Sequence, residues 1–221
     1  QELCAPLVLE EAQLVEESEL VDWIPGPVDF LPEHQGPGLG LGDLNGDGFL
    51  DALLVVRSGG ILALINDRTG RLQQGYSLPI QGADPVNAVG IALADVDADE
   101  DLDAVITASE GYPDYLLMNP GDEGSWTASE LESSMAGGLT PSFGDWDQDG
   151  DLDLFVPGFA DTFSAGDSEG QPHRLYVQED PGVYRLDNHR LPESSRFGSA
   201  YQAQPFDIDL DGDLDLFLVH D

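Results

Sequence analysis

The chain has 221 residues, of which 41% are hydrophobic, so it can bury a sizeable core and is not a disordered acidic tail. Its 44 acidic residues face seven arginines and no lysine, which gives a formal net charge of −37. This charge excludes nucleic acid and anionic membrane surfaces as partners, because both require a basic patch. No run of 18 apolar residues is present, so membrane insertion is not expected either.

The first 35 residues stand outside any repeat. Residues 9–20 are rich in helix-forming types, but their apolar spacing fits neither a helical nor a strand period, so we expect an extended segment and a candidate strand donor. Cys4 is the only cysteine and has no internal disulfide partner. We expect a free or capped thiol, with an intermolecular bridge or a lipid modification as alternatives.

One nine-residue acidic pattern occurs four times, with starts 52, 50 and 62 residues apart. Regular self-similarity of this kind is typical of repeat proteins. We number the copies loops 1 to 4, at residues 43–51, 95–103, 145–153 and 207–215. An apolar stretch precedes each loop and a strand-like run follows it, so each loop is expected to join two strands.

Further strand-like runs follow in the first three repeats, each ending near turn-forming residues. The predicted second strands are 52–56, 104–107, 154–156 and 216–219; the third are 60–65, 115–118 and 174–177; the fourth are 71–78, 126–131 and 183–186. Four strands per unit match a propeller blade of about 40 to 50 residues. The sequence therefore predicts an all-β, propeller-like array of four-stranded blades, with a loop between the first two strands of each blade.

The predicted units are an extended segment at 1–35, repeats at 36–84, 85–134 and 135–196, and a partial repeat at 197–221. The fourth blade is expected to be incomplete, because only two of its strands are recognisable.

Oxygen-bearing groups alternate along each loop. Positions 1, 3, 5 and 9 carry aspartate, or asparagine in one case, and position 7 can supply a backbone carbonyl. Ca²⁺ takes about six to eight oxygen ligands, which alternate residues of a tight turn can direct inward. We therefore expect four Ca²⁺ ions, one per loop. The candidate ligands are Asp43, Asn45, Asp47, Phe49, Asp51, Asp95, Asp97, Asp99, Asp101, Asp103, Asp145, Asp147, Asp149, Asp151, Asp153, Asp207, Asp209, Asp211, Asp213 and Asp215.

Other metal-binding loops fit less well. An EF-hand needs an acidic residue at position 12 and flanking helices, whereas position 12 is Leu54, Ile106, Val156 and Leu218 here. Magnesium demands near-octahedral geometry and keeps several waters, and zinc prefers histidine and cysteine. The four histidines lie singly outside the loops, at His34, His173, His189 and His220.

The order and spacing of the loops resemble the FG-GAP/VCBS repeat family, the calcium-binding β-propeller repeats of integrin α-subunits and bacterial surface proteins. Phe143-Gly144 and Phe197-Gly198 are similar to the Phe-Gly element of that family. Loop 2 departs from the pattern, with Glu100 where glycine is usual. The resemblance covers the chain from about residue 36 onward and implies a β-propeller fold with calcium in the loops.

No P-loop or dinucleotide fingerprint occurs, so we expect no enzyme. The expected function is that of a non-catalytic calcium-binding repeat protein, extracellular or on the cell surface, with a structural or self-assembling role. The alternative is an adhesion or ligand-binding module from a larger surface protein. A propeller enzyme is the least favoured function.

The half blade leaves a strand edge that proteins normally cover. Three explanations remain open. The chain is a fragment of a larger propeller, or residues 1–35 complete the blade in the same molecule and close a four-bladed ring, or they complete the blade of a neighbouring copy and build a head-to-tail fibre. The expected partner is therefore the chain itself, or another surface protein or glycan.

Overall fold

The computed structural model describes residues 38–55, 60–73, 76–78, 80–81, 87–109, 111–121, 125–159 and 170–220. The expectations for residues 1–35, including Cys4 and His34, and for Val56 lie outside these ranges. Within them the chain is all-β, as predicted, and its only helical elements are two 3₁₀ turns, η1 (Asn188–Arg190) and η2 (Glu193–Ser195). No helix of the described residues is long and apolar enough to cross a membrane.

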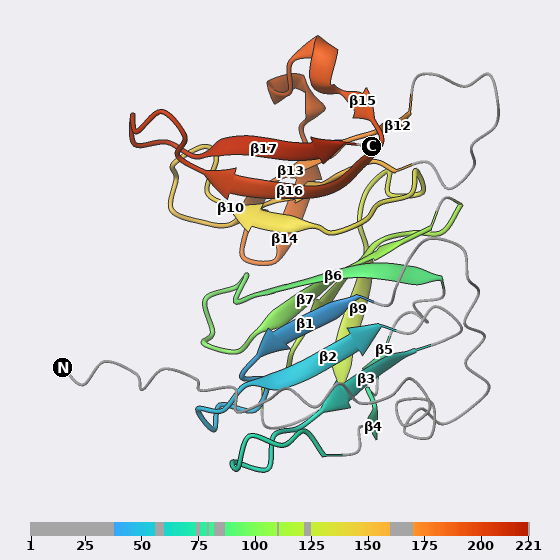
Figure 1. Ribbon diagram of the computed structural model, residues 1–221, viewed down its shortest axis with the longest axis vertical. Coiled ribbons are helices and arrows are strands. Elements are labelled where there is room, and N and C mark those ends of the chain that lie inside the picture. The colour runs from blue at the N-terminus through green and yellow to red at the C-terminus, as the bar shows by residue number, and fades with distance from the viewer. Residues whose placement is uncertain are drawn as a thin grey trace. The chain divides into compact units, whose positions relative to one another are not determined.

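The first sheet is an antiparallel meander in chain order (Figure 1). Its strands are β1 (Leu39–Gly42), β2 (Asp51–Val55), β3 (Ile61–Leu64) and β4 (Tyr76–Ser77). Among the described residues of the predicted fourth strand at 71–78, only Tyr76 and Ser77 belong to a strand, and Leu72 forms an isolated bridge with Asn66.

The second sheet has one strand more than a four-stranded blade. Its meander is β6 (Ala88–Ala94), β7 (Asp103–Ala108), β8 (Tyr115–Met118) and β9 (Trp126–Glu130). The two-residue strand β5 (Ile80–Gln81) adds to the outer edge of β9 in the parallel direction. A pairing this short leaves no period-two signal in the sequence, and β5 was not predicted.

The third sheet again has four antiparallel strands in the predicted places. They are β10 (Ser142–Gly144), β11 (Asp153–Val156), β13 (Arg174–Asp180) and β14 (Val183–Leu186). A bulge near Gln178 lets β13 run past its predicted end.

The last part of the described chain forms two small sheets. β16 (Ala200–Phe206) pairs with β17 (Asp215–His220), while β12 (Gln171–Pro172) pairs with β15 (Phe197–Gly198). The two Phe-Gly pairs lie in different places. Phe143-Gly144 ends β10 directly before loop 3, whereas Phe197-Gly198 forms β15, and Pro205-Phe206 directly precedes loop 4. In the described chain, β17 pairs with β16 alone, so the fourth blade contains two strands (Figure 1).

The sheets pack face to face in chain order, which explains the continuous apolar runs of the second strands. Every residue of β7 is buried. Ala104 and Ile106 pack into a core shared with the first sheet, and Val105 packs into a core shared with the third. The strands before the loops, β1, β6, β10 and β16, lie next to one another in that order. Among the described residues, neither strand pairing nor extensive packing joins the first sheet to the last, and no closed ring is formed.

One buried ion pair connects the second sheet to the third. Arg174 Nη2 donates a hydrogen bond to Asp114 Oδ2 at 2.8 Å, and the two side chains are 1% and 0% exposed. The other carboxylate oxygen of Asp114 accepts the Ala108 N–H at 2.9 Å, and Arg174 also donates to the carbonyl of Gly137. Both charged groups are thereby held in fixed positions inside the protein.

Candidate metal centres

The four loops share one backbone conformation. In each loop, the residue that precedes position 1 pairs with position 9 across the first two strands. Position 4 has a φ between 60° and 67° and position 6 a φ between 76° and 99° in every copy. The residues at positions 4 and 6 both adopt the left-handed backbone conformation, which winds the chain into a tight turn. They do so whether or not they are glycine.

The aspartate at position 1 organises this turn through its own side chain. One of its oxygens accepts the N–H of position 5 and the other accepts the N–H of position 6, at distances between 2.7 and 3.2 Å in the four loops. Local bonds of this kind are the reason that aspartate favours turns. The loop is therefore ordered by the protein itself.

Loop 2 keeps the turn despite its departure from the glycine pattern. Glu100 adopts a φ of 76°, in the region where the other three loops use glycine. Its N–H donates to Asp95 Oδ2 at 3.1 Å, as the glycine N–H does elsewhere. The substitution changes the energy of the loop and leaves its geometry in place.

Glu100→Gly is expected to stabilise the protein by about 1 kcal/mol, because a left-handed conformation costs a non-glycine residue about 1 to 2 kcal/mol and glycine's greater unfolded-state freedom offsets part of the gain. Urea unfolding at fixed calcium measures the change. Gly150→Ala is the matched control with the opposite sign: its φ is 99°, and an added Cβ would meet no atom within 4 Å. Shifts of the same sign in both variants would contradict this account of the turn.

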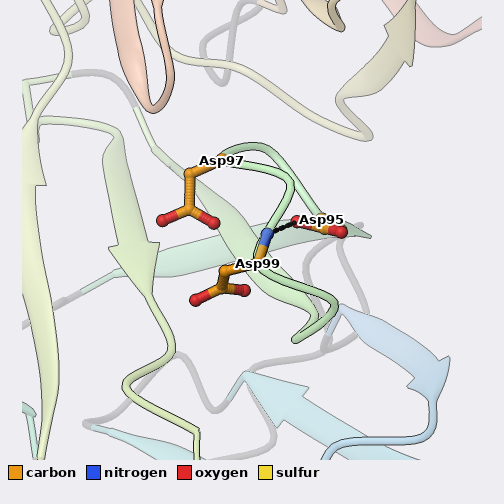
Figure 2. A group of neighbouring side chains, drawn as sticks. All are labelled: Asp95, Asp97 and Asp99. Atoms are coloured by element: carbon orange, nitrogen blue, oxygen red, sulfur yellow. Dashed lines mark hydrogen bonds between the residues drawn. The ribbon is translucent and has the colours of Figure 1, made fainter.

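Carboxylates gather inside three of the loops. Ligand oxygens of Asp95, Asp97 and Asp99 lie within 4.8 Å of one another, and Figure 2 shows all three side chains coming from a single turn of the chain. The same holds for Asp145, Asp147 and Asp149, and for Asp207, Asp209 and Asp215. The structure thus brings together positions 1, 3 and 5 in loops 2 and 3, and positions 1, 3 and 9 in loop 4.

In loops 2 and 3, position 3 carries an oxygen without a hydrogen-bond donor. Asp97 Oδ1 and Asp147 Oδ1 are buried, and no described residue donates a hydrogen bond to either. Burial raises the pKa of Asp97, and the negative charge of Asp99 raises it further. Asp151 at position 7 of loop 3 has a buried oxygen of the same kind. Such groups are costly inside a protein unless a cation compensates them.

Arginines reach into two loops. Arg68 Nε lies 3.0 Å from Asp47 Oδ2 in loop 1, and Arg190 Nη2 lies 3.2 Å from Asp147 Oδ2 in loop 3. The side chains of Arg68 and Arg190 are 66% and 42% exposed, so these ion pairs are screened by solvent and weak. Loop 1 has Asn45 at position 3, and its acidic side chains form no group of three among the described residues.

The predicted position-7 residues lie against position 5. The N–H groups of Phe49, Asp101, Asp151 and Asp213 each donate to the position-5 aspartate of their own loop, at 2.9 to 3.2 Å. Asp211 at position 5 of loop 4 receives such a bond but stands outside the carboxylate group of that loop.

The position-9 aspartates of the first three loops are buried, and their role as metal ligands stays a prediction. Asp51, Asp103 and Asp153 are 0%, 1% and 0% exposed and stand outside the carboxylate groups. One oxygen accepts the N–H of position 2 at 3.0 to 3.2 Å. Burial raises the pKa of both Asp103 and Asp153 to about 6, and backbone donors oppose that rise.

The other oxygen of position 9 has a partner that sequence reasoning missed. It accepts a backbone N–H in or just after the third strand of the same repeat, beyond the residues that pair with the second strand. The donors are Asn66, Asn119 and Gln178, at nitrogen-to-oxygen distances of 2.8 to 3.1 Å. The side-chain amides of Asn66 and Asn119 also donate to the carbonyl of position 8. An asparagine 15 or 16 residues after the position-9 aspartate was the available signal in the first two repeats.

The comparison with protein-family models agrees with this repeat structure. A family model described as an FG-GAP-like repeat matches residues 43–106 and 95–156, which together make up just over half of the chain. None of the curated proteins matches. Among solved structures, a chain of the Tc holotoxin pore of Photorhabdus luminescens is similar, with 20% identity and a TM-score of 0.45 over 87% of this chain and 8% of that one. On the family match, the chain belongs to the FG-GAP-like repeat family.

Proposed function

We propose that this chain is a non-catalytic calcium-binding protein of the cell surface or extracellular space, in which one Ca²⁺ per loop stabilises the stacked sheets. The proposal rests on the buried carboxylate oxygen without a hydrogen-bond donor that occurs at position 3 of two loops. Asp97 and Asp147, at equivalent places in loops 2 and 3, each have a buried oxygen without a described donor beside two further carboxylates. A cation bound there would compensate the charge that burial makes costly.

The donor set favours calcium over other metals. Each group offers three carboxylates and contains neither histidine nor cysteine, and hard oxygen donors suit Ca²⁺ and Mg²⁺ rather than zinc or copper. A turn with an additional backbone carbonyl as a ligand suits Ca²⁺, which takes more oxygen ligands than Mg²⁺ and tolerates less regular geometry.

Equilibrium dialysis against calcium tests the proposal, with four saturable ions per chain expected. Asp97→Ala and Asp147→Ala should each remove one ion, because position 3 then offers the cation no oxygen. Asp180→Ala is the matched control, since it removes a carboxylate at the exposed end of β13. Failure of the unmodified protein to take up calcium at millimolar concentration would overturn the proposal.

A structural role through self-assembly is supported by the β16–β17 sheet. β17 has a free edge in the described chain, and Phe217 and Val219 on it are 57% and 43% exposed. An edge of this kind is a template for strand addition by another copy or another surface protein. Sedimentation velocity in calcium should show a size that grows with protein concentration, and a size that stays constant would contradict this role.

A further inference from the structure

One histidine of the described chain is buried, and it lies outside the acidic loops. His173 stands between β12 and β13 and is 0% exposed. Its Nδ1 atom accepts the N–H of Gly158 at 2.8 Å, and its backbone N–H donates to the carbonyl of Arg196 at 2.9 Å. Because Nδ1 is already an acceptor, the neutral ring carries its proton on Nε2.

The Nε2 side of this ring faces the last strand. The ring centroids of His173 and His220 lie 5.5 Å apart in an edge-on arrangement. A Cβ added at Gly198 would lie 2.9 Å from His173 Nε2 and 2.6 Å from His220 Cε1, so the glycine of the Phe197-Gly198 pair is required for the two rings to meet here. Nε2 is buried and has no hydrogen-bond partner among the described residues. Since Nε2 carries the proton, it has no lone pair to offer a metal ion between the rings.

His173 lies where the third sheet meets the open end of the β16–β17 hairpin. Gly158 follows β11, and while its N–H donates to His173, its carbonyl accepts the N–H of Ala200 at the start of β16 at 3.0 Å. His220 ends β17 and pairs with Ala200 across the hairpin. The ring of Phe155 in β11 lies 5.9 Å from the ring of His173. One side chain thus contacts the end of β11 and the last residue of β17.

A second proton on His173 has no favourable site in this arrangement. It would bind Nδ1, where the Gly158 N–H already points, so two donors would face each other. A buried charge without a hydrogen-bond partner is costly. Burial, together with the neighbouring His220 and Arg174, accordingly lowers the pKa of His173 to about 4.

The elements packed against the ring supply no compensating negative charge. No acidic side chain of the described residues raises the pKa of His173. β17 contributes His220, and β13 contributes Arg174, which donates its own hydrogen bond to Asp114. Arg196, which precedes β15, directs its guanidinium to the carbonyl of Leu191 at 3.2 Å. β11 contributes an aromatic ring and a backbone amide, so the native protein keeps the ring neutral.

We infer that His173 is an acid-sensitive latch, which holds the open end of the β16–β17 hairpin on the third sheet while its ring is neutral and releases that end when it is protonated. An exposed histidine becomes charged between about pH 8 and pH 5, so any state that exposes His173 takes up a proton before the latched state does. The latch is therefore fully effective above about pH 6.5 and is lost as the pH falls toward about 4. It does not depend on calcium, because His173 belongs to none of the acidic loops.

Hydrogen exchange of the Ala200 N–H tests the latch, because this group donates to the Gly158 carbonyl across the contact. With a pKa of about 6.5 in the opened state and about 4 in the latched state, its protection factor should fall about 20-fold between pH 7 and pH 5. His173→Asn should lose most of this fall, because the side-chain oxygen of asparagine can accept the Gly158 N–H but does not titrate.

His189→Asn is the matched control, since it makes the same substitution at an exposed histidine and should keep the 20-fold fall. Calcium is held at one concentration throughout, so that any effect of pH on the acidic loops is common to all three proteins. A fall in His173→Asn as large as in the unmodified protein would overturn the latch.

Should His173→Asn not fold, NMR spectra of the ring nitrogens in the unmodified protein decide. At pH 5 the ring of His173 should still be neutral, with its proton on Nε2. A charged ring at pH 5, or a proton on Nδ1 of the neutral ring, would refute the latch. An absence of calcium uptake would refute the proposed function alone, because neither measurement on His173 requires a bound ion.

Discussion

Chelation of calcium by EDTA is expected to lower the melting temperature by about 20 to 40 °C. A ligand present at about 100 times its dissociation constant stabilises the native state by about 2.7 kcal/mol per site, so four sites give about 11 kcal/mol. In a chain of this length each kcal/mol corresponds to about 2 to 4 °C. Removal of the ions also restores repulsion among carboxylates in a chain of formal charge −37.

Differential scanning calorimetry with stepwise calcium addition measures this effect, and excess calcium after EDTA should restore the original transition. Two controls separate ion binding from general electrostatics. Magnesium at the same concentration should restore less stability, because it fits the loops less well. Sodium chloride at about 1 M should recover only the part due to repulsion, because it screens charge without occupying the sites. A melting temperature that does not respond to EDTA would contradict calcium stabilisation.

The loops were predictable because their determinants are local. The aspartate at position 1 accepts hydrogen bonds from the N–H groups of positions 5 and 6, so donor and acceptor both lie within the nine-residue pattern. The order of strands around each loop followed from the same pattern, since a loop that joins antiparallel neighbours fixes the next strand. Glu100 shows that residue type alone does not predict the backbone conformation at position 6. Loop 2 adopts the left-handed conformation there although the residue is not glycine.

The hydrogen bonds of the buried position-9 aspartates could not be predicted in the same way. The partner of Asp103 is the backbone N–H of Asn119, and every residue except proline has such a group. The asparagine itself is a weak signal, because the third repeat has Gln178 in its place. Position 9 alternates with the other candidate ligands in the sequence, and this alternation placed it among them. Its burial depends on a third strand that packs over it, which is a property of the sheet rather than of the loop.

The ion pair of Asp114 and Arg174 was hidden for a different reason. The two residues are 60 apart in sequence, and the chain offers 44 acidic candidates for its seven arginines. Only the stacking of the second sheet on the third brings these two together. Long-range pairs in a chain so rich in one charge carry no recognisable spacing.

Replacing Asp114 with asparagine is expected to destabilise the protein by about 3 to 5 kcal/mol, because it leaves the guanidinium of Arg174 buried without its counter-charge. The shape of the side chain is nearly unchanged, so the loss measures charge and hydrogen bonding rather than packing. Urea unfolding at saturating calcium gives the free energy of unfolding. Glu179→Gln is the matched control, because it breaks the exposed pair with Arg185, for which a change below about 1 kcal/mol is expected.

The double variant Asp114→Leu with Arg174→Met distinguishes a stabilising ion pair from a buried charge that needs a partner. Removal of both charges together is expected to recover most of the loss, since apolar side chains of similar volume replace two groups that are costly to desolvate. The recovery would show that the pair contributes little net stability and serves to fix how the second and third sheets meet. If Asp114→Asn cost no more than Glu179→Gln, the charge on Asp114 would not be needed to compensate Arg174 at this contact.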